Sequence, residues 1–436
     1  MNICMFTNTY LPHVGGVARS VDSFATDLRQ MGHEVLVIAP QFNKETPQER
    51  GTVRLPALQH FNGSDFAVRI PLPFVVEREI EAFAPDIIHS HHPFLLGDTA
   101  LRVAKQKRLP LVFTHHTLYE QYTHYVPLDS DRLETFVISL ATLYANYCDQ
   151  VVAPSRSLAR TIQARGVRSP ISIITTGVDA PFFANGRGRA FRAEHGIAAD
   201  APVVGHVGRL AAEKNLDWLA RAVRSFVGDH AKAVFLVVGS GPCRQNIADI
   251  FAQAGLEDRL IMTGQLTDRA LADAYRAMDL FVFASFSETQ GMVLAEAMAA
   301  GLPVIALEAS GVRDIVDEDR NGRLLPAAAT MGEFAGAIQA GIADPARMRR
   351  WRTEAIRTAR RHSRPVCARK LADLYMQVLQ RRQSDGHEDL EDMSALESLV
   401  SRIKLEWALF AGKVKSAVEA TASDPPDEVA PAAPND

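Results

Sequence analysis

Two carboxylates eight positions apart are the residues of this sequence with the clearest chemical potential. Glu288 lies in a polar break after the apolar run Leu280 to Ala284, and Glu296 lies inside a helix predicted to begin near Gly291. A helix amino terminus offers free N–H groups and a favourable dipole, so a phosphate is a natural ligand there. Carboxylates beside it would accept hydrogen bonds from sugar hydroxyls. The pattern predicts a nucleotide-sugar site; the alternative is a capped helix whose Glu296 faces water.

Two cationic side chains follow another apolar run and would complement a phosphate. Pro202 to Val207 is predicted to be a buried strand, and Gly208, Arg209 and Lys214 come directly after it. A guanidinium can hold phosphate oxygens in a fork, and an ammonium supplies a point charge. This arrangement favours a diphosphate-binding loop, and a solvated charged turn is the alternative.

Histidines end two predicted strands in the first half of the chain. His91 and His92 follow the apolar residues Ile87 and Ile88, and His116 follows the run Leu111 to Thr114. Side chains at the carboxyl ends of strands in open α/β sheets face the ligand crevice. A metal cluster is the other interpretation, but no carboxylate or cysteine stands at a convincing ligand spacing.

The elements that must position these residues alternate between strands and helices. The chain opens with a strand over 2–7, a glycine loop, a helix over 18–31 and a strand over 35–39, which predicts a βαβ unit. Gly15 and Gly16 in that loop let the backbone approach a ligand closely, although a double glycine is also an ordinary turn. The same alternation continues along the chain and predicts an α/β fold with parallel sheets.

Composition limits the class of protein. A chain of 436 residues is too long for one ordinary core, so two domains are expected. The formal net charge of −4 gives no support for nucleic-acid binding. The four cysteines form no CxxC pair, which favours a reducing cytoplasm. The start of the chain does not resemble a signal peptide, and no window reaches the roughly 18 apolar residues needed to span a bilayer.

These motifs together resemble a known enzyme family. Glu288 and Glu296 fit the Glu-x7-Glu signature of retaining glycosyltransferases of the GT-B fold, and the residues around them resemble the sucrose-synthase-like family, family 4. The Gly-Arg-Leu-x3-Lys-Asn pattern beginning at Gly208 is also typical of that family. Within that family, the run from Tyr119 to Tyr125 is most similar to bacterial diacylglycerol glucosyltransferases.

The resemblance implies two Rossmann-like, doubly wound domains that face a cleft. The expected segments are an acceptor domain over 1–180, a linker over 181–200, a nucleotide-sugar domain over 201–365, a crossover helix over 366–383 and a helical extension over 384–422. It implies catalytic roles for His116, Arg209, Lys214 and Glu288. It implies donor contacts from Gly15, Gly16, Gly208, Gly264, Thr289, Gln290, Gly291, Met292, Val293 and Glu296. Acceptor contacts are expected from His91, His92, Tyr119 and Tyr122.

The implied reaction moves a hexose from a nucleoside-diphosphate sugar, UDP-glucose or UDP-galactose, to a lipid hydroxyl such as that of diacylglycerol, with retention. The nucleotide sugar is a co-substrate. No metal cofactor is expected, because no Asp-x-Asp motif stands in the donor region and the leaving phosphate is the expected proton acceptor. Alternatives are a soluble sugar or sugar-phosphate acceptor, a nucleotide-sugar epimerase, and a non-catalytic nucleotide-sugar-binding assembly subunit.

The last part of the chain departs from the family pattern. Apolar residues recur every three or four positions between Met393 and Val414, which predicts one amphipathic helix. That helix would pair with another subunit through 390–414, lie on a membrane or pack on its own body. Residues 423–436 are rich in Pro, Ala and acids and are expected to be disordered. The expected location is the cytoplasm, with peripheral contact to the inner face of the cell membrane as an option that the arginine-rich run 345–370 also offers.

Overall fold

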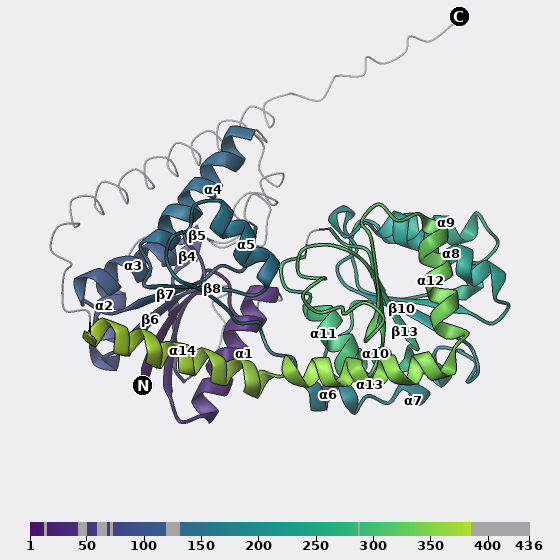
Figure 1. Cartoon of the computed structure of the whole chain (residues 1–436). Helices are drawn as coiled ribbons and strands as arrows, with labels where there is room; N and C mark the ends of the chain where they lie inside the picture. Colours follow the sequence, from purple (N-terminus) through teal and green to yellow (C-terminus); the bar gives the residue numbers. More distant parts are fainter. Residues whose placement is uncertain are drawn as a thin grey trace, which may run out of the picture.

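A computed structural model describes residues 1–12, 15–41, 50–58, 68–69, 73–118, 131–286 and 288–384. In these ranges the chain forms two α/β domains that lie side by side (Figure 1). Each domain is a parallel sheet with helices on both faces. The prediction of two Rossmann-like domains is therefore confirmed.

The first domain is built on a seven-stranded sheet in the order β3-β2-β1-β6-β7-β8-β9 within the described residues. Its strands are β1 (Asn2–Phe6), β2 (Glu34–Pro40), β3 (Thr52–Leu55), β6 (Ile87–Ser90), β7 (Leu111–Thr114), β8 (Gln150–Ala153) and β9 (Ile171–Ile173). The helices are α1 (Gly16–Gln30), α2 (Pro73–Phe83), α3 (Leu96–Gln106), α4 (Asp131–Asn146) and α5 (Arg156–Ala164). A small antiparallel pair, β4 (Ala57–Leu58) and β5 (Val68–Arg69), stands apart from this sheet.

The second domain is built on a six-stranded sheet in the order β12-β11-β10-β13-β14-β15. Its strands are β10 (Val203–Val207), β11 (Val234–Val238), β12 (Leu260–Gly264), β13 (Leu280–Phe283), β14 (Val304–Leu307) and β15 (Gly322–Leu325). Its helical elements are α6 (Ala180–Ala184), α7 (Gly188–Glu194), η3 (Ala212–Lys214), α8 (Leu216–Asp229), α9 (Arg244–Ala252), η4 (Glu257–Arg259), α10 (Asp268–Ala277), α11 (Met292–Ala299), α12 (Met331–Ile342) and α13 (Pro345–Arg361).

The strand order reverses once in each sheet, and those points position the site. β1 pairs with β2 on one side and with β6 on the other, and β10 pairs in the same way with β11 and β13. Ligands of open parallel sheets bind outside the carboxyl ends of strands at such a reversal. The loops after these strands carry most of the residues that the sequence analysis selected.

The interval 181–200, which was expected to be a linker, is part of the second domain. It forms α6 and α7, and the side chains of Phe183 and Phe191 lie in the core of that domain with Tyr275. Its glycines are needed for packing: a Cβ on Gly186 or Gly188 would lie 2.2 or 2.0 Å from a carbonyl oxygen of α10. The linker was predicted because this interval lacks a strong apolar period, whereas its glycines allow close contact with α10.

The chain crosses between the domains twice, and the two crossings are hydrogen-bonded to each other. The backbone N–H of Val178 donates to the carbonyl of His362 at 2.8 Å, and the N–H of Arg364 donates back to Val178 at 3.0 Å. A Cβ on Gly177 would lie 2.3 Å from the Cα of Arg364, so the two segments need a glycine there. The Arg364 guanidinium then binds both oxygens of Asp27 in α1, at 3.0 and 2.8 Å.

The return crossing leads into α14 (Arg364–Ser384), which continues the line of α13 along one side of both domains (Figure 1). Leu371 and Tyr375 of α14 are fully buried against α1 and β1. Within the described ranges no helix combines the length and apolar character that crossing a membrane requires. The expected extension over 384–422 and the tail over 423–436 lie outside the described residues, apart from Ser384.

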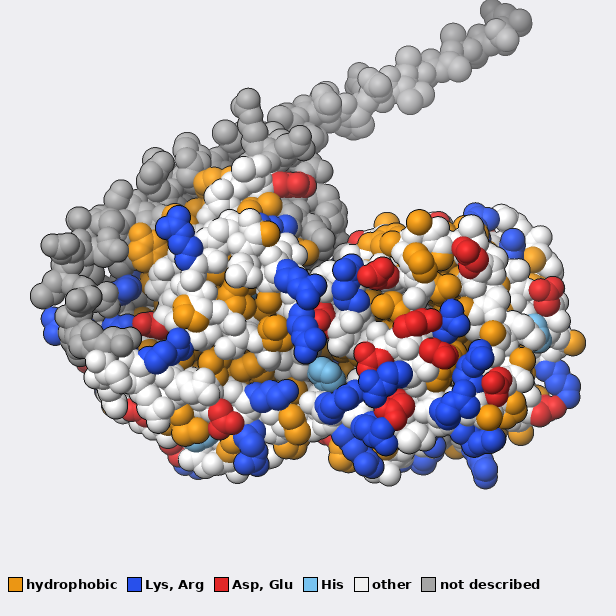
Figure 2. All heavy atoms as spheres, viewed as in Figure 1, with side chains coloured by type: hydrophobic (Ala, Val, Ile, Leu, Met, Phe, Trp, Pro, Cys, Tyr) orange, Lys and Arg blue, Asp and Glu red, His pale blue; other side chains and the backbone are white. Residues whose placement is uncertain are grey.

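The arginine-rich run on α13 is partly paired with acids. Arg352 contacts Asp279 at 3.2 Å, and Arg357 forms an ion pair with Glu354. In Figure 2 blue and red side chains are interspersed over the face of the second domain. This mixture is typical of a solvated helix face and weakens the alternative of a uniform lipid-binding patch.

Candidate active site

We call the loops that follow β10, β11, β12 and β13 the wall of the second domain, and Glu288 lies in the last of these loops. The loop between β13 and α11 carries it, and one carboxylate oxygen accepts the N–H of Gly291 at 3.1 Å. The other oxygen lies 3.3 Å from Nζ of Lys214, and both side chains are about four-fifths buried, with exposed fractions of 17% and 20%. The ion pair orients the carboxylate beside the first turn of α11, the positive end of the helix dipole.

Glycines shape the loops around this ion pair. Gly291 precedes α11 with φ of +76°, a left-handed conformation that favours glycine. A Cβ on Gly239 would lie 1.9 Å from the carbonyl oxygen of Gly208, so the loops after β10 and β11 touch through their backbones. Gly264, which ends β12, has φ of +76° and accepts the N–H of Gly239 at 2.8 Å.

The other cation selected from the sequence, Arg209, has a different partner. Its guanidinium forms an ion pair with Glu213 and is about half exposed. Sequence reasoning missed Glu213, although it directly precedes Lys214. The pair holds Arg209 at the loop that carries Lys214, so both cations lie on the same wall.

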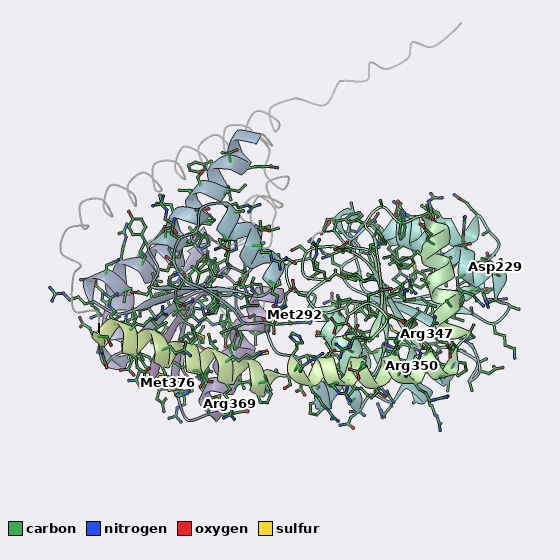
Figure 3. All side chains as sticks on the ribbon, in the orientation of Figure 1. Asp229, Met292, Arg347, Arg350, Arg369 and Met376 are labelled. Atoms are coloured by element: carbon green, nitrogen blue, oxygen red, sulfur yellow. The ribbon has the colours of Figure 1, made fainter. Side chains whose placement is uncertain are left out.

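The residues between Glu288 and Glu296 divide into different environments. The Gln290 side chain is buried and donates across the domain boundary to the carbonyl of Thr176 at 2.9 Å. The backbone of Thr289 packs against Gly311: a Cβ built on Gly311 would lie 2.9 Å from the carbonyl carbon of Thr289. Val293 is partly buried against the core of the second domain. Met292 lies at the junction of the two domains (Figure 3).

Glu296 is buried and has two partners that the sequence did not reveal. The Tyr275 hydroxyl, from α10, donates to one carboxylate oxygen at 2.8 Å. Arg19 of α1 in the first domain lies 3.9 Å from the other oxygen. Burial raises the pKa of Glu296, while the hydrogen bond from Tyr275 and the charge of Arg19 lower it. The alternative of a water-facing Glu296 is wrong.

A cavity of about 160 Å³ lies between the domains next to Glu296. Residues of α1, of α11 and of the first crossing between the domains, around Gly177, line it. Both acidic and basic side chains are among them. Its lining residues are Leu11, Arg19, Asp22, Ser23, Thr176, Gly177, Val178, Asp179, Phe183, Met292, Ala295, Glu296 and Arg364. Gly15 caps α1 and Gly16 begins it, and among the described residues outside this turn no heavy atom lies within 4 Å of a Cβ built on Gly16.

Histidines form the wall of the first domain. Nε2 of His116 lies 2.9 Å from Nδ1 of His91, and the two rings are stacked with centroids 5.2 Å apart. His92 is half-buried, and its Nδ1 accepts the backbone N–H of Asn8 at 3.1 Å. Burial lowers the pKa of His92 to about 3 and the pKa of His116 well below its ordinary value. These imidazoles are therefore neutral near pH 7.

His91 does not have the acceptor-binding position that the sequence suggested. Its side chain is completely buried beneath His116, so it offers no surface to an acceptor. The strand pattern predicted correctly that His91 lies at the carboxyl end of a strand, directly after β6, but it did not reveal that the ring is buried. Tyr119 and Tyr122 lie outside the described residues. In the part of the chain that the structure describes, no group of three or more His, Cys, Asp or Glu is arranged to hold a metal ion.

Known protein families match both domains. Residues 14–181 match the family model described as Glycosyltransferase Family 4, and residues 189–358 match the one described as Glycosyl transferases group 1.

Characterised relatives are similar over most of the chain. An alpha-monoglucosyldiacylglycerol synthase of Streptococcus pneumoniae is 29% identical over 79% of this chain and 79% of its own length. A GDP-mannose-dependent alpha-mannosyltransferase of Corynebacterium glutamicum is 31% identical over 74% of this chain and 76% of its own length.

Solved structures share the fold. Sucrose-phosphate synthase from Thermosynechococcus elongatus superposes with a TM-score of 0.69 at 22% identity, over 87% of this chain and 99% of that one. HepE of Anabaena in complex with UDP-glucose superposes with a TM-score of 0.67 at 20% identity, over 86% of this chain and 99% of that one.

Proposed function

The chain belongs to glycosyltransferase family 4, and on that premise we propose that it transfers a hexose from a nucleoside-diphosphate sugar to a lipid hydroxyl with retention at the anomeric carbon. The proposed donor is UDP-glucose or UDP-galactose, and the proposed acceptor is diacylglycerol or a similar lipid. The observation that carries the proposal is the Lys214–Glu288 ion pair at the amino terminus of α11.

The second domain's wall matches the charge that the reaction develops. Departure of the nucleotide leaves negative charge on the diphosphate, and preformed positive groups stabilise it most where charge builds up. Lys214, Arg209 and the first turn of α11 are the positive groups on this wall. Glu288 would accept hydrogen bonds from the sugar hydroxyls, and Glu296 would accept those of the ribose.

The first domain's wall matches the sugar. The breaking glycosidic bond leaves positive charge on the sugar ring, and a cationic side chain beside it would raise the energy of that state. His116 is neutral because burial lowers its pKa well below the ordinary value. It would therefore hydrogen-bond a sugar hydroxyl without opposing the charge on the ring.

The proposal includes transfer without a resident metal ion, with the leaving phosphate as the acceptor of the incoming hydroxyl's proton. Assays with an excess of EDTA over enzyme, compared with assays with added Mg²⁺ or Mn²⁺, test it. Unchanged turnover supports the proposal, whereas abolished turnover restored by one cation contradicts it.

The proposed identities of the acceptor and the sugar are inferred from the names of the relatives. The Streptococcus pneumoniae relative is named for a diacylglycerol product and carries the prefix alpha, which favours a lipid acceptor and an α-linked product. Peripheral contact with a membrane would follow from a lipid acceptor. The Corynebacterium relative is named for GDP-mannose, so α-mannosyl transfer from GDP-mannose is the second candidate.

A screen of UDP-, GDP- and ADP-sugars against diacylglycerol vesicles and soluble sugar phosphates tests the proposal directly. We expect one donor to be consumed only with lipid present, and NMR to show an α-linked product. A β-linked product from an α-linked donor would refute retention. Donor consumption without any acceptor would indicate an epimerase, and nucleotide binding without turnover would indicate a non-catalytic subunit.

A further inference from the structure

His91 lies beneath the histidine that is proposed to contact the donor sugar. Its ring is completely buried, and its Nδ1 is 2.9 Å from Nε2 of His116. We propose that His91 is a positioning residue that donates a hydrogen bond from its Nδ1 to Nε2 of His116. This bond fixes the orientation of the His116 ring and leaves the proton of His116 on its own Nδ1. The inference rests on the proposed function, in which His116 faces the sugar.

The direction of this hydrogen bond follows from the other nitrogen of His91. Two neutral imidazoles joined through one nitrogen each share a single proton in that contact. Nε2 of His91 is buried and has no hydrogen-bond partner among the described residues. If His116 were the donor, His91 would carry its proton on this unpaired nitrogen, and orphaned buried N–H groups are rarer than orphaned acceptors. The favoured state therefore has the proton on Nδ1 of His91 and a bare Nε2.

The neutral state that this reasoning needs is imposed by burial. Burial lowers the pKa of His91 well below its ordinary value, and His89 and His92 act in the same direction. A protonated His91 would present N–H groups at both nitrogens, so His116 would have to accept while an extra charge stayed buried without a carboxylate. A single N–H per ring is therefore the state that the pair adopts.

A second layer fixes the ring of His91. His89 packs against it with ring centroids 4.1 Å apart. His89 is itself held at both nitrogens, by the Tyr375 hydroxyl at 2.5 Å and the Thr114 hydroxyl at 2.7 Å. Tyr375 belongs to α14, the helix that returns from the second domain. A ring packed in this way cannot rotate freely, so His91 can impose one tautomer on His116.

The role predicts which replacement of His91 is tolerated. The side-chain amide of Asn places a nitrogen near the position of Nδ1 of a histidine, whereas the longer Gln places its amide near Nε2. His91→Asn can still donate to His116, but His91→Gln and His91→Leu cannot. We expect kcat to fall about tenfold to a hundredfold in the Gln and Leu variants and only a few-fold in the Asn variant, because removing the outer partner of an oriented histidine has effects of that size.

Two further measurements separate positioning from packing. Thermal unfolding of each variant identifies a general loss of stability, and His230→Asn controls for loss of an imidazole elsewhere, at the C-cap of α8 in the second domain. ¹⁵N spectra of histidine-labelled protein, assigned with His91→Asn and His116→Asn, report which nitrogen of His116 carries the proton. We expect Nδ1 in the wild type and a changed or mixed tautomer in His91→Leu.

The outcomes are distinguishable. Equal kcat losses in folded Asn and Gln variants, or a His116 tautomer that is the same in wild type and His91→Leu, would overturn the positioning role. A wild-type protein without transferase activity on any donor would overturn the proposed function instead, and the ¹⁵N arm would still decide the tautomer.

Discussion

The groups proposed to face the sugar and those proposed to face the phosphates, one set in each domain, use opposite electrostatic strategies. The first domain presents imidazoles that burial keeps neutral, stacked and hydrogen-bonded to each other. The second presents two ion pairs, the mostly buried Lys214–Glu288 pair at the amino terminus of α11 and the Arg209–Glu213 pair, whose arginine is half exposed. Neutral donors tolerate deep burial because their desolvation cost is small, whereas charged groups need partners or water.

This difference between the domains suits a reaction in which opposite charges develop at the two ends of one bond. A glycosidic bond to a diphosphate breaks towards negative charge on the phosphates and positive charge on the sugar. Fixed cations beside the diphosphate and neutral imidazoles beside the sugar would favour both changes at once. Four substitutions or conditions test this division of roles.

Loss of Lys214 is expected to have the largest effect. Lys214→Ala removes the ammonium that orients Glu288 and opposes phosphate charge, and we expect kcat to fall about 10²- to 10³-fold. Steady-state kinetics with saturating donor measure it. Lys232→Ala, which removes an exposed lysine paired with Asp200, is the matched control. Turnover close to wild type in Lys214→Ala would remove the charged wall from the mechanism.

Loss of the Tyr275 hydroxyl is expected to have the next largest effect. Tyr275→Phe leaves the buried Glu296 without its hydroxyl donor, and hydrogen bonds to charged groups contribute about 1.5–3 kcal/mol. We expect a weaker affinity for the nucleotide by about tenfold, together with a lower midpoint of unfolding. Calorimetric titration with the nucleoside diphosphate and chemical denaturation are the two measurements. Unchanged values in both would show that Tyr275 does not support Glu296.

Acid is expected to destabilise the histidine wall. Burial lowers the pKa of His89 to about 3, so below pH 6.5 the unfolded chain binds a proton that the folded chain does not. The contribution is fully present above pH 6.5 and is lost as the pH falls towards 3; by pH 5.5 about 1.4 kcal/mol of it has been lost for this residue. Denaturation curves between pH 8 and 5 measure it, with His89→Gln as the variant. The same pH slope in wild type and variant would contradict this assignment.

Loss of Arg19 is expected to have the smallest effect. Its guanidinium lies 3.9 Å from Glu296 across the domain boundary and is 44% exposed. Such solvent-exposed pairs contribute about 0.2–1 kcal/mol, so Arg19→Gln should change the nucleotide affinity only a few-fold and less at high salt. Titrations at low and high ionic strength provide the comparison, and a loss beyond tenfold would mean that Arg19 contacts the ligand itself.

The sequence by itself determined the fold class and the residues of the charged wall. Apolar runs of four to five residues predict the strands, and the loop positions of Lys214 and Glu288 follow from where those runs end. Glu-x7-Glu lies within a single loop and helix, so its pattern survives in local spacing. The strand ends predicted the histidines of the other wall in the same way.

Only the tertiary structure decided which groups meet. Tyr275 and Arg19 reach Glu296 from positions 21 and 277 residues away, and Tyr375 reaches His89 from 286 residues away. Local sequence patterns cannot predict such pairs, because the packing of separate elements creates them. The same reason explains the interval 181–200, whose glycines resemble a linker until α10 is packed against them, and His91, whose burial depends on the ring above it.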